Sequence, residues 1–137
     1  MTVPRVVFAC VLTCAISSVA LAQPRASYQQ TQYKGQEIGK LTGDTYYARM
    51  DDYVSVFMVT PDGIVLVEPI GTEMATWLKG ELAKRFNVPV KYVIYSHSHS
   101  DHIAGTNALG KVPTIIAQAE TKRLLARDND PQRPLPT

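Results

Sequence analysis

The stretch that decides the fold reads Tyr95-Ser96-His97-Ser98-His99-Ser100-Asp101-His102. It contains all 3 histidines of the chain. His97, His99 and Asp101 alternate with serines, and an extended backbone turns residues i, i+2 and i+4 to the same side. His102 breaks this alternation. We therefore expect the first three side chains to face one point if the backbone stays extended through Asp101, and His102 to join them only if the chain bends there.

The residues on either side of this stretch predict how it is held. Residues 88–95 are mostly apolar and β-branched, which is typical of a buried strand. Ile103-Ala104-Gly105 follows, with small residues where a helix can start. The predicted order is strand, ligand loop and helix N-terminus.

Imidazole nitrogens and a carboxylate oxygen are the usual protein ligands of a catalytic zinc ion. Four such groups lie too close in sequence to serve one face of one ion. They fit two ions better, with His97 and His99 on one and Asp101 and His102 on the other, about 3.5–4 Å apart. The alternative is a polar, serine-rich turn in which Asp101 caps the next helix. Three clustered histidines favour the metal site.

The pattern H-x-H-x-D-H resembles the motif of the metallo-β-lactamase superfamily, and the resemblance runs from about Gly35 to Thr137. It implies His97 and His99 on a first metal and Asp101 and His102 on a second, normally zinc. It also implies metal-assisted hydrolysis, with Asp101 orienting the nucleophile as a catalytic residue. Members act on lactams, thioesters, lactones, sulfate esters and phosphodiesters, and some are iron-dependent dioxygenases.

The remaining pattern predicts an α/β layered fold with a mixed sheet and helices on one face, which is the N-terminal half of the family's αββα sandwich. The turn Thr60-Pro61-Asp62-Gly63 joins two strands, the second of which ends at Glu68. A helix with an apolar face begins near Thr72, its expected cap, and ends near Asn87. Expected strands are 38–41, 45–49, 53–59, 64–68 and 114–117, and expected later helices are 104–109 and 119–127.

The chain divides into four segments by composition. Residues 1–22 are a predicted signal peptide, 23–35 a polar and disordered leader, 36–127 the metallo-β-lactamase-like domain, and 128–137 a Pro-rich linker. The complete family fold needs roughly twice the residues left after cleavage, near the upper end of common domain sizes. We therefore expect only its first half here, truncated in the linker.

Three features predict export: the basic residue Arg5, the apolar stretch 6–20 and the A-x-A cleavage site Ala20-Leu21-Ala22. The apolar stretch is only marginally long enough to span a bilayer, so we expect cleavage and no membrane anchor. The mature protein should begin at Gln23 in the periplasm or the medium. Mass spectrometry of the exported protein tests this, and a cytosolic chain that retains Met1 would contradict it.

Composition fits one soluble domain, with 45% hydrophobic and 19% charged residues. The net charge of +2 and the absence of a basic run argue against nucleic acid and favour a small-molecule substrate. Cys10 and Cys14 leave with the signal peptide, so no cysteine of the mature chain can bind metal.

The family takes further metal ligands from downstream positions, and this chain has no histidine outside the motif. Two hypotheses follow. One is an exported zinc hydrolase that is incomplete as given. The other is a non-catalytic fragment that binds metal weakly or pairs with a second polypeptide. A further alternative to both is a mono-iron dioxygenase of the same fold. Glu68 stands where the family usually has aspartate, either orienting the ligands or as an exposed acid at the strand end.

Overall fold

The computed structural model describes residues 34–112 and 114–137, so the predicted signal peptide and nearly all of the leader lie outside the described residues. A single six-stranded sheet runs in the order β1-β2-β3-β4-β5-β6. The first four strands are antiparallel neighbours, and β5 and β6 join as parallel strands. The strands are β1 (Gln36–Thr42), β2 (Thr45–Met50), β3 (Tyr53–Thr60), β4 (Gly63–Val67), β5 (Val90–Tyr95) and β6 (Thr114–Ala117). The predicted mixed sheet is confirmed.

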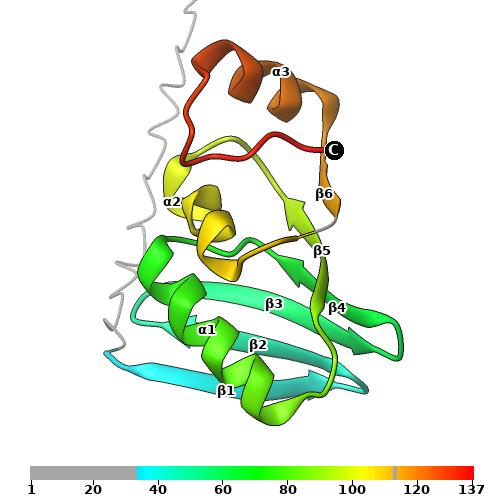
Figure 1. The fold of residues 1–137 in the computed structure, drawn as a ribbon. Coiled ribbons are helices and arrows are strands. Elements are labelled where there is room, and N and C mark those ends of the chain that lie inside the picture. Colours follow the sequence, from blue (N-terminus) through cyan, green and yellow to red (C-terminus); the bar gives the residue numbers. More distant parts are fainter. Residues whose placement is uncertain (1–33, 113) are drawn as a thin grey trace, which may run out of the picture. The chain divides into compact units, whose positions relative to one another are not determined.

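Four helical segments connect or follow these strands, and they are α1 (Thr72–Arg85), α2 (Ser100–Ile103), η1 (Ala104–Leu109, a 3₁₀ helix) and α3 (Ala119–Asp128). In Figure 1, α1 crosses in front of the antiparallel strands, and α2 and η1 lie beside its beginning. Two details of α1 differ from the prediction. Its cap is Gly71, with no side-chain cap bond from Thr72, and it ends at Arg85, before Asn87. No helix in the described part of the chain is long and apolar enough to cross a bilayer.

The core lies between the sheet and α1. Along each strand the side chains alternate between the two faces, so one set turns toward the helices. Fully buried members of this set come from β3, β4 and β5, and they pack with α1 residues of the predicted apolar face; these are Phe57, Ile64, Leu66, Val93, Met74, Leu78 and Leu82.

The opposite face of the sheet carries apolar side chains, and no helix of residues 34–112 and 114–137 covers them. One row crosses five strands in register and consists of Tyr47, Val56, Val67, Ile94 and Ile116. Ile116 is 46% exposed, and Met58 on the same face is 44% exposed. In β4, Ile64 and Leu66 are fully buried toward the helices, whereas Val65 and Val67 on this face are only partly buried.

The connection between β4 and α1 is bound closely to the helices that follow the histidine motif. Ile70 N–H donates to the carbonyl of His102 at 2.9 Å, and Gly105 N–H donates to the carbonyl of Ile70 at 2.7 Å. A Cβ atom at Gly105 would lie 2.5 Å from the carbonyl oxygen of Gly71, so only glycine allows this approach. This contact fixes the residues before α1 against the end of the motif.

Candidate metal centre

The predicted same-side alignment of His97, His99 and Asp101 requires an extended backbone through the motif. The structure does not have one. The chain bends after β5, and α2 begins at Ser100 with His99 as its cap residue. A helix starts here because the positive end of a helix favours serine and aspartate. The helical turn carries His102 back toward His97, and their ring centroids lie 4.4 Å apart.

The four predicted ligand residues gather around His97. The ring of His99 packs edge to face against it, at 4.6 Å between centroids. Asp101 lies next to His102, with 3.7 Å between the carboxylate Oδ2 and the imidazole Nε2. His99 and Asp101 are exposed, while His97 and His102 are partly buried. The arrangement is an open cluster of three imidazoles and one carboxylate at the surface.

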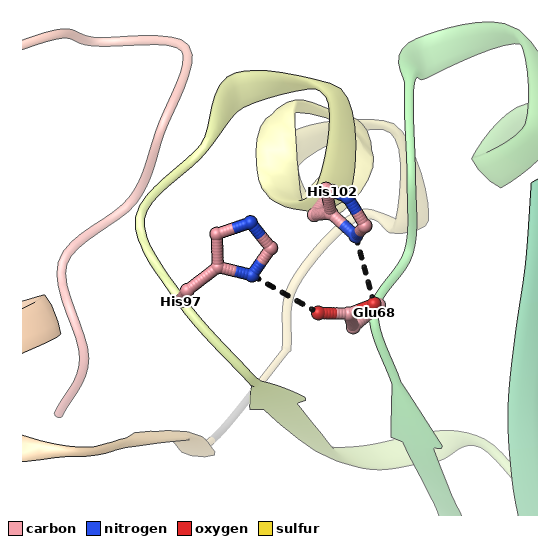
Figure 2. Close-up of side chains that lie close together, drawn as sticks. All are labelled: Glu68, His97 and His102. Carbon is pink, nitrogen blue, oxygen red and sulfur yellow. Dashed lines mark hydrogen bonds and ion pairs between the residues drawn. The ribbon is translucent and has the colours of Figure 1, made fainter. Parts of the chain in front are cut away.

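Glu68 belongs to the same cluster, and its side chain is only 15% exposed. Its Oε2 lies 2.8 Å from Nδ1 of His102, and its Oε1 lies 3.7 Å from Nδ1 of His97. Figure 2 shows the carboxylate between the two rings. Glu68, His97 and His102 also form the one group of three residues, among those the structure describes, whose ligand atoms all lie close enough to hold an ion.

Backbone strain at Glu68 accompanies these contacts. Glu68 and Ile70 both have positive φ, at 56° and 62°. A branched residue such as isoleucine rarely adopts this conformation, and each such residue costs about 1–3 kcal/mol. Strain of this kind is typical of functional sites, and here it lies at the residue that contacts both histidines.

A short hydrogen-bond chain connects Glu68 to both imidazoles. Burial raises the pKa of the Glu68 carboxyl, but hydrogen bonds from Ser96 and His102 outweigh burial and bring its pKa below the ordinary value. An ionised carboxylate only accepts, so Ser96 Oγ donates its single proton to Glu68. Nδ1 of His97, 2.7 Å from Ser96 Oγ, must then be the donor to that oxygen. Nδ1 of His102 donates directly to Glu68.

Glu68 thus contacts the ring of His102 directly and that of His97 through Ser96, and it holds the two rings side by side. Neutral imidazole with a lone pair on one nitrogen and a hydrogen-bonded second nitrogen is the form that binds zinc in proteins. Imidazole and carboxylate groups of this kind fit a metal, and His97 and His102 lie within ligand distance of each other and of Glu68. The other two predicted ligands, His99 and Asp101, lie beside them but outside that group. The sequence left the role of Glu68 open. Its position before Pro69 did not indicate that its carboxylate contacts Ser96 and His102.

Residues 49–132 match the sequence model of the metallo-beta-lactamase superfamily, which is more than half of the chain. The chain belongs to this superfamily. The fold and the motif predicted the same family. No curated protein matches the chain significantly.

Solved structures of metallo-β-lactamases share the fold. MEM-A1, a subclass B3 metallo-beta-lactamase from a soil metagenome library, aligns with a TM-score of 0.59 and 24% identity, over 67% of this chain and 36% of that chain. The metallo-beta-lactamase from Pontibacter korlensis aligns with a TM-score of 0.61 and 20% identity, over 74% of this chain and 51% of that chain. SMB-1, solved with mercaptoacetic acid, aligns with a TM-score of 0.58 and 25% identity, over 67% and 37%. The chain spans between about a third and a half of these proteins.

Two open hollows meet at Asp101, which lines both. One, of about 430 Å³, is lined by the motif on one side and by the end of α3 with Arg133 on the other. The other, of about 410 Å³, has an apolar floor that includes Met50 and Met74. Both are open to the surface beside Asp101.

Proposed function

We propose that this chain is the first half of an exported, zinc-dependent hydrolase of the metallo-β-lactamase superfamily, with a lactam, thioester, lactone or related ester as substrate. The observation that carries the proposal is the hydrogen-bond chain through Ser96 and Glu68. It holds His97 and His102 side by side as candidate metal ligands, next to His99 and Asp101.

Each residue has a role in this proposal. His97 and His99 would hold the first ion and Asp101 and His102 the second, and each pair lies close together. A bound zinc ion supplies Lewis acidity, which lowers the pKa of water and polarises a carbonyl oxygen. Asp101, 52% exposed at the meeting point of the two hollows, orients the water molecule by accepting its hydrogen bond. Glu68 orients His97 and His102 from behind.

The second candidate function is that of a partner-dependent fragment, and the uncovered face of the sheet favours it. An apolar row across five strands is the kind of surface that another polypeptide or a second half of the fold would cover. The similar solved structures are two to three times as long as the aligned part of this chain. In both candidates the metal cluster of this chain needs further residues to become a catalytic site.

Metal uptake tests the ligand assignment. Replacement by alanine of any one of the four residues His97, His99, Asp101 and His102 should lower the zinc content after dialysis, with equal effects for the pair that shares the first ion. The control is Asp62→Asn, at an exposed turn of the chain. Elemental analysis measures zinc and iron together, and therefore also separates the hydrolase from a mono-iron dioxygenase. Unchanged zinc content in a His97→Ala, His99→Ala double variant would exclude the assignment.

A further inference from the structure

The segment after α3, predicted as a linker, lies against the metal cluster. The chain reverses at Asn129, whose φ of 47° ends α3. Asn107 Nδ2 of η1 then donates to the carbonyl of Pro131 at 3.1 Å, and the Tyr95 hydroxyl donates to the carbonyl of Pro134 at 3.3 Å. Side chains of two separate elements, η1 and β5, thus hold residues 129–134 in place.

Arg133 is the residue of this segment that reaches the motif. Its side chain is only 14% exposed. Its Nη1 donates to the backbone carbonyl of Ser98 at 3.0 Å, its Nε donates to Asp130 Oδ2 at 2.9 Å, and its Nη2 lies 3.5 Å from Asp128 Oδ2. All three guanidinium nitrogens therefore have a partner, and the partner on the motif side is a main-chain oxygen.

The carbonyl of Ser98 belongs to the rigid peptide plane that joins Ser98 to His99. A donor that fixes this oxygen fixes the direction in which the chain leaves His97 and enters His99. Ser98 also lies in the bend between β5 and α2, where no strand or helix ladder orders the backbone. The hydrogen bond from Arg133 therefore orders the part of the motif that its neighbours in sequence leave unsupported.

The guanidinium is itself preorganised. Asp130 accepts from the backbone N–H of Gln132 through Oδ1, at 2.9 Å, and from Arg133 through Oδ2. The backbone of residues 130–132 therefore fixes the Asp130 carboxylate, and this carboxylate in turn fixes the Arg133 guanidinium. The two carboxylates of Asp128 and Asp130 also balance the charge of Arg133 and of Arg127, which pairs with Asp128. Arg133 can thus lie beside a cation site without a net positive field that would repel the ion.

We propose that Arg133 is a positioning residue for the metal ligands, which acts by holding the Ser98 carbonyl and thereby sets the angle between His97 and His99. The metal part of this inference rests on the proposed function, whereas the ordering of the loop does not. Lysine cannot replace arginine here, because a single ammonium lacks the planar fork that reaches Ser98 and Asp130 together.

Hydrogen exchange on the metal-free full chain tests the ordering of the loop. Arg133→Ala should accelerate amide exchange in a peptide that covers 96–102 by about tenfold or more, since a hydrogen bond from a charged donor is lost. Arg127→Ala is the matched control, because Arg127 pairs with Asp128 but makes no contact with Ser98, and it should leave exchange unchanged. Equal exchange in the wild type and Arg133→Ala would overturn the proposal.

Zinc affinity and the visible spectrum of the cobalt-loaded full chain test the consequence for the metal. Arg133→Ala and Arg133→Lys should both weaken zinc binding about tenfold or more and change the cobalt spectrum, while Arg127→Ala retains both. If Arg133→Ala does not fold, Arg133→Lys carries the test. Wild-type affinity and spectrum in a folded Arg133→Lys variant would overturn the positioning role. A wild type that binds no zinc but shows the exchange difference would overturn the proposed function and support the ordering role of Arg133.

Discussion

Residues 23–137 joined to the second half of a metallo-β-lactamase relative are expected to gain a hydrolytic activity that the same residues lack alone. The chain alone should hydrolyse a chromogenic lactam, a thioester and a lactone no faster than free zinc. Its 3 histidines and Asp101 provide two protein ligands for each ion, whereas a catalytic zinc site normally has three. Reacting groups that lie about 1 Å from their productive positions can cost a further ~100-fold in rate.

The same assay with and without the added half separates the two candidate functions. Restored turnover that is abolished by a chelator and by His99→Ala supports the hydrolase. If the joined protein folds and binds two zinc ions per chain but remains inactive, the fragment hypothesis gains support. Appreciable turnover by residues 23–137 alone, sensitive to chelator and to His99→Ala, would show that four protein ligands suffice in this chain.

Glu68→Gln should weaken zinc binding by about 10–100-fold, because the carboxylate behind metal-bound histidines fixes their orientation. Glutamine offers one acceptor oxygen where Ser96 and His102 both need one. One of the two histidines would then lose the hydrogen bonding that orients its ring. Competition with a chromophoric chelator measures the affinity, and ¹⁵N shifts of the imidazoles report which nitrogen carries the proton.

The control for this substitution is Glu120→Gln on α3, which removes an exposed ion pair with Arg123 and should leave zinc affinity unchanged. Glu68→Asp adds a second comparison, since a side chain shorter by one methylene cannot reach Ser96 and His102 together. Unchanged affinity in Glu68→Gln would contradict the positioning role. A loss of one whole zinc ion per chain would instead identify Glu68 as a direct ligand.

Strand and helix positions followed from the sequence because their signals are local. The turn at 60–63 and the apolar runs on either side of it predicted β3 and β4, and 114–117 was predicted at the bounds of β6. The apolar spacing of α1 predicted its buried face, including Leu78. Each of these depends on residues that lie within a few positions of one another, and sequence patterns report such contacts well.

The site was less predictable because its geometry depends on contacts between distant residues. Alternation in the motif indicated an extended ligand loop, but the helix that starts at Ser100 decides which rings meet. Glu68 reaches His102 because of a strained backbone that no composition signal indicates. Proline content made 128–137 resemble a linker, whereas side chains of β5 and η1 bind its carbonyl groups.

The order of strands in the sheet has a consequence for how the chain is made. Spatial order follows chain order from β1 to β6, so each strand that emerges during synthesis finds its partner already present. Pairings of this local kind form quickly. The hydrogen bond between Arg133 and Ser98 spans 35 positions and can form only after α3 has emerged. The histidines are therefore present well before the loop that carries them is set, and an ion captured in that interval meets ligands whose spacing is not yet fixed.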